Sequence, residues 1–117
     1  SGQVPNQPPK RTTLGSATQK MAEPIKEFDL DNLVTQCDRM RSDKDRMRLI
    51  SAAIEDKNFT CEQANRIIKV QRTGDFQIST AISLYGRVTD PDRFVSVVVN
   101  AFPFNEDKTQ IKEALGL

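Results

Sequence analysis

Histidine and tryptophan are both absent from this chain of 117 residues. The absence of histidine removes the commonest general base and the commonest metal ligand of proteins. The glycines all stand isolated, so no glycine-rich loop is available to hold a phosphate group. The carboxylates lie near expected helix starts or on exposed faces, where capping and solvation account for them. The sequence therefore predicts a protein that is not an enzyme and that uses no cofactor and no metal.

Long apolar runs and a strong net charge are also missing. The longest apolar stretch is VSVVV, far shorter than the roughly 20 residues that cross a membrane. The net charge of +1 gives no strong overall field that would attract nucleic acid or an anionic membrane. The N-terminus has no apolar signal segment, and its Ser-Gly start resembles the remnant of a tag. We expect no membrane span; the compartment stays open, with an intracellular one slightly favoured.

Cysteine is scarce, with only Cys37 and Cys61 in the chain. Two cysteines are too few for a disulfide scaffold or a zinc knuckle. Cys37 shares an expected apolar helix face with Leu33 and Val34, and buried free thiols behave as small hydrophobic side chains. We expect both thiols to be reduced and to lie in the core or at its boundary. The alternative is one disulfide between neighbouring helices, which a secreted protein would permit.

Residues 1–26 differ in composition from the rest, with four of the six prolines, Pro5, Pro8, Pro9 and Pro24. Apolar residues are sparse there and follow no period, so the segment cannot bury enough surface to offset its ordering entropy. The composition predicts a disordered, proline-rich linker. A frayed terminus is the simpler alternative. A docking segment is a third, because Pro5 and Pro8 form one PxxP pattern.

Residues 28–117 carry apolar side chains at helical spacing, which predicts an all-α domain of five or six short helices. The stretch VSVVV alone could form a strand. The Asp-Pro-Asp sequence before it and the spacing of Phe94, Val98 and Ala101 favour a helix instead. The expected helices cover residues 30–41, 43–56, 61–71, 75–86, 91–102 and 106–115.

Capping residues mark most of these helix boundaries. Ser42 and Asp90 suit N-cap positions, and Pro91 suits the first helical turn. Thr60 and Gln63 have the spacing of a capping box. The other expected boundary residues are Asp75 and Asn105 at helix starts and Gly86 and Gly116 just past helix ends.

A repeat is visible when Phe59 is placed on Phe94, an offset of 94 − 59 = 35 residues. At this offset, apolar positions coincide across two expected helices and the turn between them. A third partial copy follows, because residues 43–50 resemble residues 107–115. The pattern indicates a duplicated helix-turn-helix unit, or two hairpins that solve the same packing problem. So few units favour a compact bundle over a long solenoid.

Acidic turns precede the two matching phenylalanines, at Glu55-Asp56 and at Asp90–Asp92. A calcium-binding loop would need oxygen ligands at set positions and a central glycine. Both segments fail this pattern, since the glycine is missing and Cys61 or an apolar helix takes later positions. We therefore interpret the turns as boundaries between packed helices, with Phe59 and Phe94 anchored in the core.

Three phrases of the sequence resemble those of a known family. They are a Phe-Thr helix start with a following glutamine (Phe59, Thr60, Gln63), a Leu-Tyr, Val, Asp segment (Leu84, Tyr85, Val88, Asp90) and a phenylalanine-rich stretch (Phe94, Phe102, Phe104). Over residues 28–117 the chain is similar in these phrases to the family called domain of unknown function 4476. The resemblance implies a small helical module, often at the end of a longer protein, and it implies no catalytic residues.

Two basic segments are candidates for binding. In residues 39–48, RMRSDKDRMR, the acidic Asp43 and Asp45 lie among five basic residues, which favours a solvated helix junction over a charged patch. Residues 57–72 are less balanced, with Lys57, Arg66, Lys69 and Arg72 against Glu62. Aromatic residues are not interleaved with these charges, which argues against single-stranded nucleic acid.

We therefore expect a non-enzymatic protein–protein interaction or scaffolding module with an unidentified protein partner. The alternative is an anion-binding module, in which Lys57, Arg66, Lys69 and Arg72 bind anionic lipid or nucleic acid. An enzyme that uses Cys61 is the least favoured hypothesis. That thiol lies near an expected helix N-terminus, but no base is available to activate it.

Overall fold

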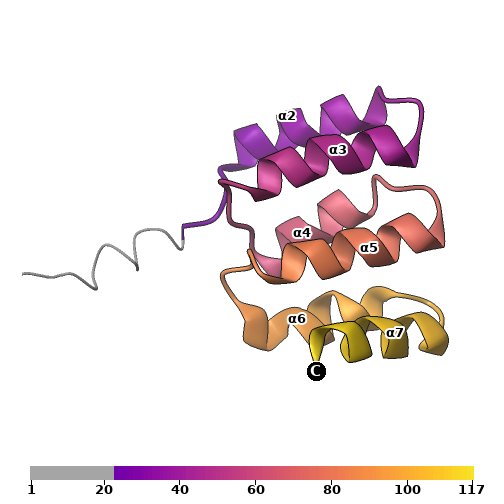
Figure 1. The fold of residues 1–117 in the computed structure, drawn as a ribbon. Helices are drawn as coiled ribbons and strands as arrows, with labels where there is room; N and C mark the ends of the chain where they lie inside the picture. Colours follow the sequence, from indigo (N-terminus) through magenta and orange to yellow (C-terminus); the bar gives the residue numbers. More distant parts are fainter. Residues whose placement is uncertain (1–22) are drawn as a thin grey trace, which may run out of the picture.

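The computed structural model describes residues 23–117, and its regular elements are helices (Figure 1). They are α2 (Glu27–Asp38), α3 (Asp43–Ile54), α4 (Cys61–Ile68), α5 (Gly74–Tyr85), α6 (Phe94–Val97) and α7 (Asn105–Leu115), with 3-10 helices η1 (Pro91–Arg93) and η2 (Val99–Ala101) on either side of α6. The predicted all-α bundle of short helices is confirmed for these residues. None of these helices is long and apolar enough to cross a membrane.

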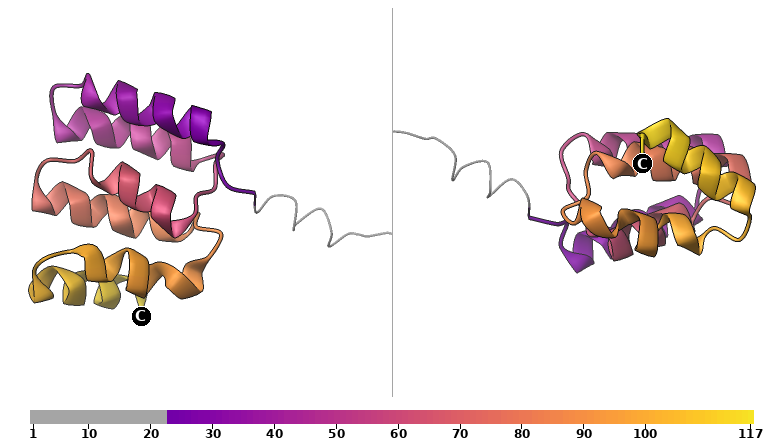
Figure 2. Two further views of the ribbon diagram at one scale, coloured as in Figure 1. Left: turned by 180° about the vertical axis from the view of Figure 1, so that it is seen from behind. Right: turned by 90° about the horizontal axis from the view of Figure 1, so that it is seen from below.

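The helices pair into three hairpins that stack on one another: α2–α3, α4–α5 and α6–α7 (Figure 1). Seen along the stack, they form two layers, with α2, α4 and α6 in one layer and α3, α5 and α7 in the other (Figure 2). The helices of the second layer begin at Asp43, Gly74 and Asn105, a constant spacing of 74 − 43 = 105 − 74 = 31 residues. This spacing differs from the offset of 35 residues found in the sequence, which placed α3 and α4 on α5 and α6. Within the described residues the repeated unit is a hairpin, and it occurs three times.

Stacked hairpins give the molecule two distinct ends. The loops within the hairpins, residues 39–42, 69–73 and 102–104, lie at what we call the loop end. The segments that lead into each hairpin, residues 23–26, 55–60 and 86–90, lie at the opposite end, which we call the connector end (Figure 1). Side chains from both layers fill the space between them, and Leu30, Ile50 and Leu84 are fully buried there.

Local capping explains several helix starts as predicted. The Ser42 side chain accepts a hydrogen bond from the Asp45 N–H and begins α3. Thr60 and Gln63 form the predicted capping box of α4. Gly116 has a φ of 71° and ends α7 in the left-handed conformation, as expected. Gly86 directly follows α5, as expected, and its φ of −68° is right-handed.

Other boundaries differ from the prediction. The first helix spans Glu27–Asp38 rather than 30–41, and α4 ends at Ile68 rather than at 71. Asn105 is the first residue of α7 and makes no side-chain cap, since Phe104 takes the N-cap position. The earlier end of α4 goes with a tertiary contact, because Gln71 turns its side chain into a buried polar cluster.

The segment 91–102 was predicted as one helix and is instead three short pieces. The Val97 carbonyl, where α6 ends, accepts a hydrogen bond of 2.8 Å from the Asn65 side chain. This bond takes an acceptor that a continuing helix would use. Val98 and Val99, at and just after the break, are both fully buried.

The predicted linker over residues 1–26 lies outside the described residues up to 22. For residues 23–26, the prediction of a disordered linker is wrong. Ile25 is buried, its N–H donates to the Asn58 carbonyl over 2.7 Å, and its own carbonyl accepts from the Gln63 side chain. The folded domain therefore begins before Glu27 and includes Ile25.

Candidate functional site

A polar cluster occupies the loop end, and we call it the loop-end cluster. Its buried members are Asp43, Arg46, Gln71 and Thr80, and the exposed Thr73 borders them. The Asp43 carboxylate accepts from Arg46 Nη2 at 2.8 Å and from the backbone N–H groups of Arg72 and Thr73 at 2.8 and 2.9 Å. Arg46 also donates to the Met40 carbonyl over 2.7 Å. Asp43 thereby ties the first hairpin to the loop of the second.

The cluster has the chemistry of a structural joint. Gln71 donates from Nε2 to the Asp43 carbonyl and to Thr80 Oγ1, and Thr80 Oγ1 lies 2.7 Å from the Phe76 carbonyl. Burial would raise the pKa of Asp43, but the hydrogen bonds from Arg72, Arg46 and Thr73 outweigh it and lower the pKa to about 2. A carboxylate held so strongly in its charged form is unsuited to proton transfer at neutral pH.

Backbone hydrogen bonds dominate the connector end. Phe59 donates from its N–H to the Arg87 carbonyl, and the Thr89 N–H donates to the Phe59 carbonyl, each over 2.8 Å. Phe59 and Val88 thus form an isolated parallel bridge. The Arg87 guanidinium donates to the carbonyls of Lys57 and Glu55, where α3 has just ended. Each connector is therefore fixed against the next one.

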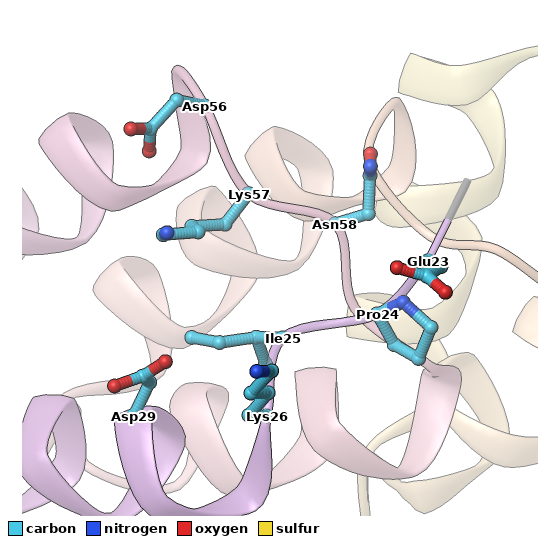
Figure 3. Close-up of a pocket in the computed structure, with 8 residues that line it drawn as sticks. All are labelled: Glu23, Pro24, Ile25, Lys26, Asp29, Asp56, Lys57 and Asn58. Carbon is cyan, nitrogen blue, oxygen red and sulfur yellow. The ribbon is translucent and has the colours of Figure 1, made fainter. Parts of the chain in front are cut away.

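A polar hollow of about 420 Å³ opens beside this end (Figure 3). Lys57 extends from the α3–α4 connector, with Asp56 above it and Asp29 of α2 across from it (Figure 3). The acidic side chains here, Glu23, Asp29 and Asp56, alternate with Lys26 and Lys57. The described residues contain no group of side chains arranged to hold a metal ion, in this hollow or elsewhere.

The acidic turns of the sequence serve to join hairpins. Phe59 and Phe94 are both fully buried, so their predicted place in the core is confirmed. We expected the Asp90 side chain to cap its own helix, but it makes no such hydrogen bond. Its carboxylate instead accepts from the Cys61 N–H at the start of α4, over 2.9 Å. The Tyr85 ring packs edge-on against Phe94 with ring centroids 4.9 Å apart.

Both cysteines are free and buried, which confirms the main expectation and contradicts the alternative of a disulfide. Burial raises the pKa of the Cys37 thiol to about 11. Burial, with the hydrogen bond and charge of Asp90, raises the pKa of Cys61 to about 12. The Cys61 thiol donates a hydrogen bond to the Asp90 carbonyl over 3.2 Å. Neither thiol has the electropositive, accessible surroundings of a reactive cysteine.

The four basic residues predicted as an anion site do not converge on one place. Lys57 lies in the connector before α4, and Arg72 lies in the loop after it, at opposite ends of the molecule. Arg66 and Lys69 are exposed near the C-terminal end of α4, but Arg66 is paired with Asp31 at 2.8 Å and with Glu27 at 3.3 Å. Carboxylates of α2 thus already balance the Arg66 charge.

The segment 39–48 differs most from its sequence-based interpretation as a solvated junction. Asp43 and Arg46 are buried in the loop-end cluster. Other basic residues of the segment surround a hollow of about 550 Å³ on the first hairpin, which we call the α2–α3 hollow. Its apolar side chains are Met40, Leu49 and Ala52; its charged side chains are Arg39, Arg41, Arg48 and Asp45. Helical spacing could have revealed it, because positions 45, 48, 49 and 52 form one stripe of α3.

A second hollow, of about 430 Å³, lies on the other side of the same stripe. Met47 and the half-buried Phe76 of α5 contribute apolar surface to it, and Arg48 and Ala52 border both hollows. Exposed apolar surface therefore gathers along α3 on both sides of one ridge. This is the arrangement that a partner helix or loop would cover.

A comparison with known protein families finds a match to this chain. The model of the family described as Domain of unknown function (DUF4476) matches residues 24–115. The resemblance seen in the sequence is thereby confirmed, and the matched stretch covers all three hairpins. No curated protein and no solved structure shows a significant match to the chain.

Proposed function

The chain belongs to the DUF4476 family, and we propose that its helical domain is a non-enzymatic module that binds another protein. The observation that carries the proposal is the pair of hollows along the exposed side of α3. Both combine methionine, leucine or phenylalanine surface with arginine, a composition typical of protein interfaces. Methionine side chains also adapt their shape to a partner.

The chemistry of the remaining polar groups supports a binding role over a catalytic one. The polar side chains of the loop-end cluster, most of them buried, are bonded within the cluster. The two thiols are buried and have raised pKa values. The chain also has no histidine, the commonest general base of enzymes.

Anion binding through Lys57, Arg66, Lys69 and Arg72 is the alternative proposal. It draws less support from the geometry, because Arg66 is already paired and the other three are spread from one end of α4 to the other. Charge-driven binding to lipid or nucleic acid would weaken steeply as the salt concentration rises. Binding through an apolar surface would change far less, so a salt series separates the two proposals.

Site-specific photo-crosslinking tests the proposed function. A photoreactive phenylalanine analogue at Ala52, which borders both hollows, should trap a protein in cells that express the full chain. The matched control places the same group at Thr109, an exposed position of α7 in the third hairpin. The trapped protein must then bind the purified chain, and Leu49→Glu must weaken that binding. The proposal fails if neither position traps a protein that rebinds, or if only lipid or nucleic acid is recovered.

A further inference from the structure

The α2–α3 hollow is built by the first hairpin alone. All of its lining residues lie between Arg39 and Ala52, and none comes from the second or third hairpin. Leu49 and Met40 are half-buried at its floor, and the exposed Ala52 leaves the floor open. The α3 stripe of positions 45, 48, 49 and 52 repeats at the spacing by which one helix packs against another.

Guanidinium groups without a partner gather around this hollow. Elsewhere in the described residues, Arg46, Arg66 and Arg93 are paired with carboxylates, Arg87 is bonded to backbone carbonyls, and Arg72 stands alone without a side-chain partner at the loop end. No ion pair or hydrogen bond among those residues holds the Arg39 or Arg41 side chain. Arg48 has only an exposed contact of 3.2 Å with Asp45.

The side chains that line the hollow therefore carry more positive than negative charge. Three arginines and one aspartate line the hollow, a formal charge of 3 − 1 = +2 around an apolar floor. Arginine is suited to bidentate bonds with carboxylates, and its weak hydration makes it a good interface residue. Glutamates and aspartates on a partner segment would balance this positive charge.

We infer that the α2–α3 hollow receives an acidic amphipathic helix of a partner protein. This inference rests on the proposed function and specifies its site. The apolar face of the helix, with residues at i, i+3, i+4 and i+7, packs on Met40, Leu49 and Ala52. Carboxylates along its edges pair with Arg39, Arg41 and Arg48, which fixes its orientation.

Two features of the molecule favour a helix over other occupants. The floor is a straight stripe along α3, as an incoming helix requires, and it offers few open backbone groups for an added strand. A lipid surface would need basic residues on a broad face, whereas these arginines surround one hollow. A second copy of the chain is an outcome that the experiment below recognises.

The test is an NMR titration of the isotope-labelled chain with three synthetic peptides of about 18 residues, roughly five helical turns. The first has leucines on one face and glutamates on the other. The second is a scrambled peptide of the same composition. The third keeps the amphipathic pattern but carries lysine in place of glutamate. Shifts of the backbone amides locate the site, and their saturation gives the Kd.

We expect the first peptide to shift amides in residues 39–52 and to bind at least about tenfold more tightly than the other two. The charge-swapped variant Arg39→Glu/Arg41→Glu should reverse the preference between the first and third peptides. Lys69→Glu, an exposed charge change outside the hollow, should leave all three affinities unchanged. These positions are exposed, so the variants keep the fold, which their spectra verify.

Several results would overturn the inference. Shifts outside residues 39–52, equal binding of the scrambled peptide, or an unchanged preference in the charge-swapped variant would each do so. Shifts of residues 39–52 on concentrating the chain alone would assign the hollow to a second copy, and stronger shifts with phosphatidylserine vesicles would assign it to lipid. A partner crosslinked at Ala52 that competes with none of the peptides would reject this inference and leave the proposed function standing.

Discussion

The loop end and the connector end join neighbouring hairpins by different chemistry. At the loop end, the Asp43 side chain reaches Thr73, 30 residues further along the chain. At the connector end, backbone N–H and carbonyl groups join Phe59 to Arg87 and Thr89. A side-chain joint depends on the identity and the charge of a few residues, whereas a backbone joint depends on the path of the chain. The two ends should therefore respond differently to mutation and to pH.

The largest expected effect comes from the apolar anchors of the connector end. Phe59→Ala and Phe94→Ala should each lower the free energy of unfolding by about 3–5 kcal/mol, because each empties a fully buried aromatic site. Small domains have only about 5–15 kcal/mol in total, so thermal and urea unfolding should both show a large loss. Phe28→Ala, at a side chain that is 74% exposed, is the control and should change stability by less than about 0.5 kcal/mol. Melts close to wild type for both core variants would show that the connectors do not rely on these anchors.

An intermediate effect, with a pH signature, is expected at the loop end. The pKa of Asp43 is about 2 in the folded chain against an ordinary 3.8, so the folded state releases this proton more readily than the unfolded state. Its contribution to stability, about 2 kcal/mol, is fully present above about pH 4 and is lost as the pH falls toward 2. Asp43→Asn should remove this contribution, and its difference from wild type should shrink as the pH falls through that window.

Urea unfolding between pH 7 and pH 2 measures this loss. Asp45→Asn is the matched control on the same helix, because its partner Arg48 is 70% exposed and such surface pairs contribute about 0–1 kcal/mol. Parallel pH curves for Asp43→Asn and wild type would contradict the role given to this carboxylate.

The smallest effect is expected where the connector end does use a side chain. Arg87→Met should cost about 1 kcal/mol, because it removes hydrogen bonds to two carbonyls of the neighbouring connector and keeps the length of the side chain. Unlike the Asp43 effect, it should not vary between pH 7 and pH 3. Amide hydrogen exchange should quicken at Phe59 and Thr89, where the backbone bridge lies. Lys69→Met serves as the exposed control, expected within about 0.5 kcal/mol of wild type, and an equal loss there would reject the argument.

The same contrast explains which parts of the fold the sequence predicts. Ser42 and the pair Thr60–Gln63 act within one helical turn, so residue type and spacing were sufficient to place them. Asp90 has the same local pattern, yet its carboxylate binds the N–H of Cys61, 29 residues earlier. A capping pattern shows that an acceptor is available and does not show which helix will use it.

The candidate surface follows the same division. Charge counting along residues 39–48 treats all five basic residues as equivalent, but Arg46 becomes a buried partner of Asp43 and Gln71. Arg66 likewise appeared available in the sequence and is balanced by Asp31, 35 residues away. The arginines left around the α2–α3 hollow can be identified only after these pairs have been assigned.

The sequence by itself determined the helical class, the approximate helix positions and the burial of Phe59 and Phe94. These properties depend on periodicity and capping, which act over a few neighbouring residues. Only the tertiary structure decided how the hairpins stack, where the helix predicted at 91–102 breaks and which arginines keep an unbalanced charge. Each of these depends on groups about 30 residues apart, such as Asn65 with the Val97 carbonyl, and folding alone brings such groups within hydrogen-bonding distance.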